Sequence, residues 1–327
     1  MRMVVELTNR CNLSCGHCFE ERHADTGNLP AGIFEKVLHE AHSCNIDHFS
    51  FTGGEPTLHP RFPEIVCQLS DAGYTFSMVS NGSTFGHIYP LLAEHRARFS
   101  GVTFSLDGAR EEVHDRLRGR GSYRQVMRAI SICVVRNLPF TLNMVITSQN
   151  RSQVKEMTEL ATRLGSGGVR FGHLMPNPET ELRCLTLSPE QRRETEREIW
   201  RLQRTASVPV GMAPGYYSSS PFFPCGPLEL QEVNLDYRGN LTLCCQLSGY
   251  GNEAPPTDVI GNLGQMTLKE ARLEFEAKGQ TYLREKRSRV DRGDFGELDS
   301  FPCLYCVQYL DKVSHVKLRQ QYACTIP

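Results

Sequence analysis

The chain has 327 residues, which is enough for one large domain and a smaller second one. Its 36 lysine and arginine residues and 37 aspartate and glutamate residues give a net charge of −1. This balance argues against a general binder of nucleic acid or of membrane surfaces. The sequence before Cys11 does not resemble a signal peptide, and no apolar run is long enough for a membrane span. We therefore expect a cytoplasmic protein that binds neither nucleic acid nor membranes.

From residue 3 to about 204, short apolar runs of β type alternate with amphipathic helical patterns. The expected strands are 3–8, 47–52, 75–80, 102–106, 139–146 and 168–174, and the expected helices are 31–43, 61–72, 87–98, 122–136, 151–164 and 188–204. Six consecutive βα units predict an α/β fold with a parallel sheet covered by helices. The periodicity leaves open whether this sheet is flat or curled into a barrel.

After about residue 205 the composition changes to clusters of proline, glycine, serine and aromatic residues. Residues 236–240 predict the turn of a β-hairpin, and a helix is expected at about 267–285. We interpret the basic run at 284–289 as a solvated face. The sequence thus predicts a large domain at 1–205 and a small one at 206–327, which a metal cluster helps to fold.

The thirteen cysteines gather near both ends of the chain. Because the cytosol keeps thiols reduced, this distribution predicts two metal sites rather than disulfides. Cys11, Cys15 and Cys18 follow the first strand, at the edge of the sheet where α/β enzymes place their sites. Three thiolates from one loop suit an iron-sulfur cluster with one open iron. A zinc site completed by His17 or His23, or a chance cluster, is the alternative.

The second expected strand ends in Gly53-Gly54-Glu55-Pro56. Two glycines let a ligand lie against bare backbone, and the Glu55 carboxylate can accept hydrogen bonds from an ammonium group. Alone this pattern is a common turn, but it stands one βα unit after the cysteine loop. We therefore expect both segments to contribute to one site.

Five short motifs occur together in the first half of the chain. They are CNLSCGHC at 11–18, GGEP at 53–56, SNG at 80–82, SLDG at 105–108 and HDRLRG at 114–119. Over residues 3–175 the chain thereby resembles the radical S-adenosylmethionine (SAM) superfamily, whose cysteine loop reads CxxxCxxC. The resemblance implies a partial (β/α)6 TIM-like barrel.

The resemblance also implies the cofactors. A [4Fe-4S] cluster would be bound by Cys11, Cys15 and Cys18, and its open iron would be chelated by the amino and carboxylate groups of SAM. An electron from a donor such as flavodoxin or ferredoxin would cleave SAM to methionine and a 5′-deoxyadenosyl radical, which takes a hydrogen atom from the substrate. The cofactors supply this chemistry, and the protein binds and orients them.

By the same resemblance, the expected SAM-binding residues are His17, Gly53, Gly54, Glu55, Ser80, Asn81, Ser105 and Arg118. The GGEP residues would hold the amino group, and His17 lies where family members usually have an aromatic residue near the adenine. Ser80 and Ser105 are expected to contact the ribose or the carboxylate, and Arg118 to pair with the carboxylate. The alternatives are a surface salt bridge for Arg118 and a capped strand end for Ser105.

Six cysteines follow residue 224. Cys225 and Cys244 flank the predicted hairpin, Cys303 and Cys306 form a close pair, and four such thiolates can close around a second cluster. This stretch resembles the twitch domain, a shortened SPASM domain found behind many radical SAM barrels, which implies one auxiliary [4Fe-4S] cluster. The residues after the pair lack the further cysteines of a full SPASM pattern, which argues against another auxiliary cluster.

Cys245 and Cys324 are left over from this assignment. Cys245 is a candidate catalytic residue that could donate a hydrogen atom to a substrate radical, and Cys324 could replace one of the four ligands. For each, the alternative is a small buried residue.

The sequence thus predicts a radical SAM oxidoreductase that performs an oxidation assisted by an auxiliary cluster, on an unidentified small molecule or peptide. One alternative is a maturase of a ribosomally made peptide, forming a crosslink or an epimer. Only ten residues precede Cys11, whereas many such maturases carry an amino-terminal peptide-recognition domain. An alternative of another class is a zinc-stabilised binding module.

Overall fold

Ten strands form one sheet in the computed structural model, which describes residues 1–18, 26–175, 184–213, 215, 222, 225–248, 256–294 and 301–312. The strands are β1 (Arg2–Thr8), β2 (His48–Gly53), β3 (Thr75–Ser80), β4 (Phe99–Ser105), β5 (Phe140–Ile146), β6 (Val169–His173), β7 (Val210–Met212), β8 (Glu232–Leu235), β9 (Asn240–Thr242) and β10 (Val259–Asn262). Their order in the sheet is β10-β9-β8-β1-β2-β3-β4-β5-β6-β7. All neighbouring pairs from β1 to β7 are parallel, which confirms the six predicted strands and their direction.

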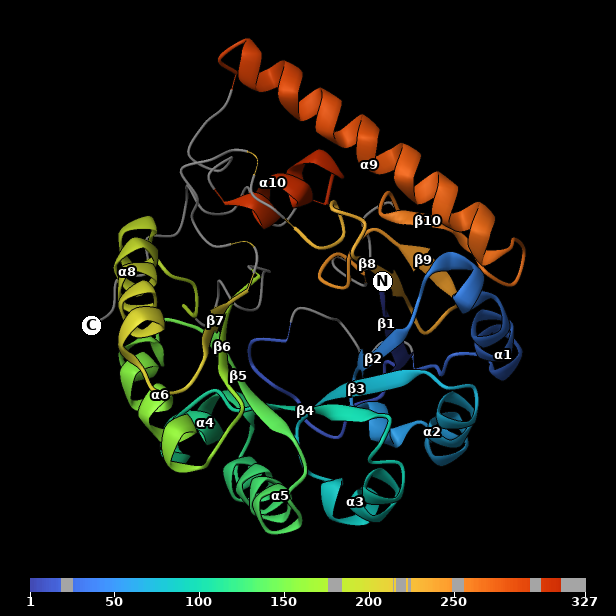
Figure 1. The fold of residues 1–327 in the computed structure, drawn as a ribbon. Helices are drawn as coiled ribbons and strands as arrows, with labels where there is room; N and C mark the ends of the chain where they lie inside the picture. Colours follow the sequence, from blue (N-terminus) through green and yellow to red (C-terminus); the bar gives the residue numbers. More distant parts are fainter. Residues whose placement is uncertain are drawn as a thin grey trace.

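Helices cover the outer face of this curled sheet (Figure 1). They are α1 (Ala31–Glu40), α2 (Phe62–Asp71), α3 (Phe85–Glu94), α4 (Glu111–Arg118), α5 (Ser122–Arg136), α6 (Val154–Arg163) and α8 (Pro189–Thr205). Short 3-10 turns η1 (Ala41–Cys44), η2 (Pro56–Leu58) and η3 (Arg151–Gln153) extend or precede three of them. The predicted helices are confirmed to within a few residues, whereas α4 and β7 were not predicted. None of the described helices has the length and apolar character needed to cross a membrane.

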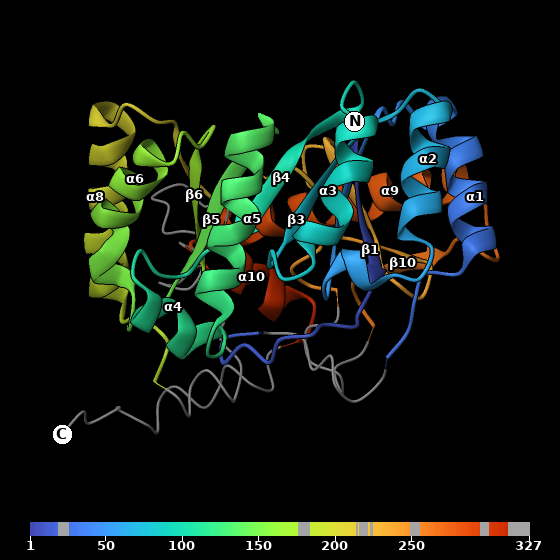
Figure 2. The same ribbon diagram turned by 90° about the horizontal axis from the view of Figure 1, so that it is seen from below.

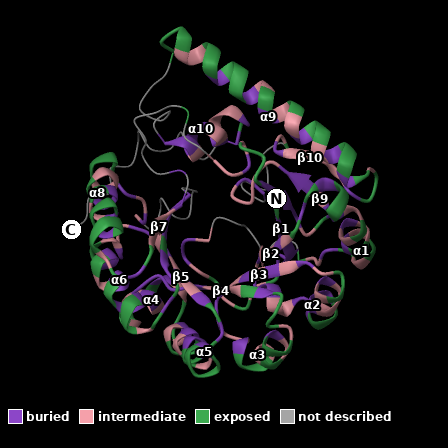
Figure 3. Cartoon of the chain, viewed as in Figure 1, coloured by how far each residue is buried: buried purple, intermediate pink, exposed green. Residues whose placement is uncertain are grey.

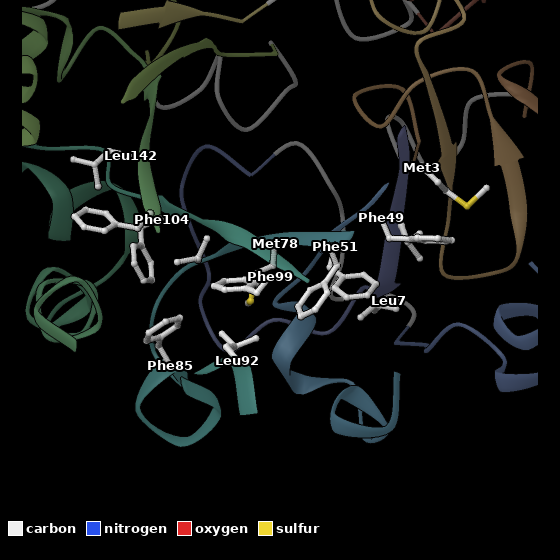
Figure 4. Packing of buried hydrophobic residues seen from close by; sticks show 14 of the residues in the cluster. Met3, Leu7, Phe49, Phe51, Met78, Phe85, Leu92, Phe99, Phe104 and Leu142 are labelled. Carbon is white, nitrogen blue, oxygen red and sulfur yellow. The ribbon is translucent and has the colours of Figure 1, made fainter. Parts of the chain in front are cut away.

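Alternation of residue types along the strands builds the core. Phe49 and Phe51 on β2 and Phe76 on β3 are fully buried, and they share one core cluster with Phe99 and Phe104 of β4 and with residues of the helices. Figure 4 shows part of this cluster, including Phe49, Phe51, Phe99 and Phe104. Each buried phenylalanine contributes about 1.5–3 kcal/mol by leaving water. Because side chains alternate between faces, polar residues such as Ser77 face the concave side. Residues of the strands are accordingly mostly buried, whereas exposed residues lie mainly on the outer sides of the helices (Figure 3).

The predicted hairpin of the small domain extends the barrel's own sheet. Strand β8 pairs with β1 in parallel, and β9 returns antiparallel to β8. The turn is closed by Asp236, whose backbone N–H donates to the Asn240 carbonyl oxygen at 2.9 Å, and by Gly239, whose φ of +86° suits glycine. The division at residue 205 stays a prediction, since the sheet is continuous across it.

Two helices complete the carboxyl-terminal part, α9 (Leu268–Asp291) and α10 (Pro302–Tyr309). Helix α9 begins with a reciprocal capping box in which Thr267 and Glu270 each accept the other's backbone N–H. It runs past the expected end at 285 and includes the basic run 284–289. Arg284 and Arg287 are exposed as expected, but Lys286 is buried, so the prediction of a wholly solvated face was wrong for this residue.

Candidate functional site

The three-cysteine loop begins directly after β1, at the carboxyl edge of the parallel sheet. Cys11, Cys15 and Cys18 are half-buried and form no disulfide. The loop is fixed to α4, because the Gly16 N–H donates to the Leu117 carbonyl oxygen at 2.9 Å. The ribbon viewed from below shows this loop along one end of the barrel (Figure 2).

The double glycine after β2 packs against the chain that leads into the cysteine loop. The Gly54 N–H donates to the Thr8 carbonyl oxygen and the Glu55 N–H to that of Arg10, both at 2.8 Å. A Cβ atom at Gly54 would overlap the carbonyl oxygen of Arg10, and one at Gly53 would overlap that of Thr8. The sequence predicted that these glycines let a ligand lie against bare backbone. In the structure, the chain's own strand end occupies these positions.

Glu55 is completely buried and joins the ends of β2 and β3. Its carboxylate accepts hydrogen bonds from the Thr57 hydroxyl at 2.7 Å, the Ser80 hydroxyl at 3.0 Å and the Asn81 backbone N–H at 2.8 Å. Burial raises the pKa of Glu55, and these hydrogen bonds oppose that rise. The carboxylate therefore organises the strand ends, and its contact with SAM stays a prediction.

Two polar side chains reach sulfur atoms of the loop. Asn81 places Nδ2 3.9 Å from Cys11 Sγ and also donates to Oδ1 of Asn12 at 3.0 Å. Arg118 places Nη1 3.9 Å from Cys15 Sγ. Burial raises the pKa of the Cys15 thiol to about 11, although the charge of Arg118 opposes the rise. Donors aimed at sulfur suit thiolates that carry the negative charge of a metal centre.

Asp107 holds Arg118 and His17 together behind the loop. The aspartate is fully buried, pairs with the Arg118 Nε–H and lies 3.1 Å from His17 Nε2. Its other oxygen accepts the Val145 N–H at 2.7 Å. Burial alone would raise the pKa of Asp107, but the charges of Arg118 and His17 outweigh it and hold the pKa well below the usual range.

Asp107 was not among the predicted site residues, although it lies within the SLDG motif. Arg118 forms a salt bridge, as the alternative expected, but the pair with Asp107 is buried rather than on the surface, since the arginine side chain is 11% exposed. Ser105 lies buried at the end of β4, next to this group in the chain. Its contact with SAM stays a prediction.

The four carboxyl-terminal cysteines line one apolar cavity of about 50 Å³, together with Met175, Leu243, Leu247, Phe275 and Tyr282 among others. We call it the four-cysteine pocket; its thiols belong to Cys225, Cys244, Cys303 and Cys306. Cys225 precedes β8, Cys244 follows β9, and the close pair lies on α10. Segments far apart in the chain thus bring the predicted ligands to one place.

Burial raises the pKa of the Cys225 thiol to about 12, and burial also raises the pKa values of Cys303 and Cys306. Metal binding would therefore have to release protons from this pocket. Cys245 adjoins the pocket and shares a hydrogen bond with Cys244, which raises the pKa of Cys244 further. The proposed catalytic role of Cys245 stays a prediction.

The donor set of both sites fits iron-sulfur clusters. In the described part of the chain, no group of three or more cysteine, histidine, aspartate or glutamate side chains is arranged so that it could hold a single metal ion. A cluster does not require such convergence, because each cysteine ligand binds its own iron atom. Cys184 is disulfide-bonded, although the distribution of the cysteines predicted metal sites rather than disulfides. Cys44 and Cys133 are buried and form no disulfide. Cys324 lies outside the described residues.

These features define the class of the amino-terminal part as an α/β partial barrel with a cysteine loop at the carboxyl edge of its sheet. Its family follows from the sequence, because residues 5–161 match the model described as the radical SAM superfamily. Residues 5–161 are therefore a radical SAM domain, which confirms the resemblance for this part of the chain.

The curated relatives include a heme synthase, a maturase and a peptide cyclase. An AdoMet-dependent heme synthase of Methanosarcina barkeri is 31% identical over 180 residues, 52% of this chain and 50% of that protein. The mycofactocin maturase MftC of Mycobacterium tuberculosis is 30% identical over 212 residues, 63% of this chain and 53% of the relative. A PqqA peptide cyclase of Gluconobacter oxydans is 27% identical over 281 residues, 83% and 75% of the two chains. The chain thus spans about half the length of the first two.

Solved structures share the fold. Streptococcus suis SuiB, crystallised with S-adenosylmethionine, superposes with a TM-score of 0.64 over 82% of this chain and 64% of that protein, at 17% identity. This likeness confirms the partial barrel predicted from the sequence.

Proposed function

We propose that the protein is a radical SAM enzyme that oxidises its substrate with the help of an auxiliary [4Fe-4S] cluster. The observation that carries the proposal is the presence of two unlike groups of cysteines in one chain, one on the loop after β1 and one around β8, β9 and α10. Three thiols on one loop leave an iron open for SAM, whereas the four thiols of the four-cysteine pocket can close a cluster completely. The layout of the second site supports a twitch-type domain.

The residues around the first site bind and orient. A cluster bound by Cys11, Cys15 and Cys18 would supply, with an electron from a flavodoxin- or ferredoxin-like donor, the cleavage of SAM to the 5′-deoxyadenosyl radical. Arg118 and Asn81 donate toward the sulfur atoms of Cys15 and Cys11. Gly53, Gly54 and Glu55 hold the loop against β2, where the amino group of SAM is expected.

The second site would take part after hydrogen abstraction. A cluster held by Cys225, Cys244, Cys303 and Cys306 would supply the acceptor for the one electron that a substrate must still lose, together with a proton to solvent, after giving one hydrogen atom to the radical derived from SAM. Apolar neighbours such as Leu243, Leu247 and Phe275 line the pocket and would keep water from the cluster. The substrate is thereby oxidised by two electrons in total.

Cys303→Ala tests the auxiliary site. We expect the anaerobically purified parent to hold about eight irons and eight sulfides, the sum of two [4Fe-4S] clusters, and the variant to hold about four. The variant should still cleave SAM to 5′-deoxyadenosine but should form no oxidised product. A colourless parent containing zinc would instead favour the binding module, and a fully active variant would contradict an essential auxiliary cluster.

A peptide is a second candidate for the substrate, favoured by the two relatives named as a maturase and a peptide cyclase. If it is the substrate, a short reading frame should neighbour the gene. Its synthetic peptide, deuterated along the chain, should pass deuterium into 5′-deoxyadenosine on incubation with the reduced enzyme and SAM. Mass spectrometry of both products checks this. Peptide of unchanged mass together with unlabelled 5′-deoxyadenosine would favour a small molecule.

A further inference from the structure

Helix α9 buries one stripe of residues whose chemistry changes along its length. The buried positions are Leu268, Ala271, Phe275, Gly279, Tyr282 and Lys286. Their spacing of three or four residues places them on one face. The stripe is apolar near the start of the helix, and its last two residues carry a hydroxyl and an ammonium group. This polar end lies beside the four-cysteine pocket, which Gly279 and Tyr282 help to line.

The Tyr282 hydroxyl contacts a predicted cluster ligand directly. Its oxygen lies 3.1 Å from the Sγ atom of Cys306, and the tyrosine is 4% exposed. A thiolate bound to iron has no proton to give, so in the metal-bound state the hydroxyl is the donor. The hydrogen bond therefore favours negative charge on that sulfur.

Lys286 brings a buried positive charge to the same place. The residue is 4% exposed, and Nζ lies 4.3 Å from the ring centre of Tyr305, which in turn packs edge-on against Tyr282. Its positive charge acts on the sulfur atoms of Cys303 and Cys306 in the pocket. Burying an ammonium group costs free energy unless negative charge compensates it. Thiolates around a cluster supply such charge.

We infer that Tyr282 and Lys286 set the reduction potential of the auxiliary cluster and make it a better electron acceptor. This inference rests on the proposed function. Reduction adds one negative charge to the cluster, and a hydrogen-bond donor and a buried cation both stabilise that added charge. The negative charge of four thiolates disfavours the addition of a further electron to the cluster. Tyr282 and Lys286 on one face of α9 offset this charge, so that the cluster can accept the electron from the substrate radical.

The test is a redox titration of the auxiliary cluster. Full-length protein carrying Cys11→Ala, Cys15→Ala and Cys18→Ala is reconstituted with iron and sulfide, so that the remaining electron paramagnetic resonance signal belongs to the auxiliary cluster. Tyr282→Phe and Lys286→Met should each lower the equilibrium constant for reduction about tenfold, a shift of about 59 mV to more negative potential for one electron. Lys286→Arg should retain the parent potential.

Two matched variants separate this effect from packing. Tyr309→Phe removes a hydroxyl that is hydrogen-bonded to Glu285, from a ring whose centre lies 4.8 Å from that of Tyr282. Lys269→Met removes an exposed lysine of α9. Both should keep the parent potential. If all variants bind about four irons and have the same reduction potential, the inference is wrong although the auxiliary site stands. The same conclusion follows if Tyr309→Phe shifts the potential as much as Tyr282→Phe does. A parent triple variant that binds no cluster would overturn the auxiliary site and the inference with it.

Discussion

Cys15→Ala should abolish the formation of 5′-deoxyadenosine from SAM under reducing conditions. With one of three ligands removed from the loop, the first cluster loses the coordination that leaves a single iron open. The Arg118 guanidinium also loses the sulfur atom toward which it donates. Chromatography of the nucleoside products after incubation with SAM and dithionite measures the loss, which should exceed a hundredfold.

Cys67→Ala is the matched control, because this free thiol lies on α2 and contacts His95 rather than either cysteine site. It should cleave SAM at the parent rate. Undiminished cleavage by Cys15→Ala would refute the assignment of the loop, whereas equal losses in both variants would indicate general damage to the fold.

Asp107→Asn should lower the free energy of unfolding by about 3–5 kcal/mol, the usual cost of removing one partner from a buried ion pair. Asparagine is nearly isosteric but leaves the buried Arg118 without its carboxylate. Urea unfolding of the metal-free protein, followed by circular dichroism, measures the change. The control is Glu156→Gln, which breaks the exposed pair with Arg110 and should cost no more than about 1 kcal/mol.

The same variant carries a pH signature. The pKa of Asp107 is lowered in the folded state, so its stabilisation is fully present above the unfolded pKa of about 3.9. That stabilisation is lost as the pH falls from there toward the folded pKa. The gap in stability between the parent and Asp107→Asn should therefore narrow as the pH falls below about 4. A gap that widens on acidification would contradict the ion pair.

The barrel could be predicted from the sequence because its signals are local. Apolar and polar residues alternate along β2 and over most of β3, and each strand is followed by a helical pattern of ordinary length. Helix α4 escaped prediction because it has only eight residues and is strongly polar. Strand β7 escaped because three residues give no measurable period.

The supporting residues of the site were harder to predict because their roles depend on tertiary contacts. An aspartate after a strand is typical of a turn, and nothing local indicates that Asp107 would pair with Arg118, eleven positions away on α4. Lys286 lies in a run of charges that resembles a solvated helix surface, and its burial depends on α10 packing across α9. The cysteines could be assigned because their spacing itself carries the chemistry.

The parallel pairing of β8 with β1 has a consequence for how such an enzyme could be altered. Strand β1 leads into the loop of Cys11, and the hairpin that starts with β8 leads to Cys244. A slip of one residue in this ladder would turn the side chains of β8 to the opposite face of the sheet. The carboxyl-terminal segment therefore cannot be exchanged between relatives as an independent cassette, and a working chimera must carry β1 and β8 from the same parent.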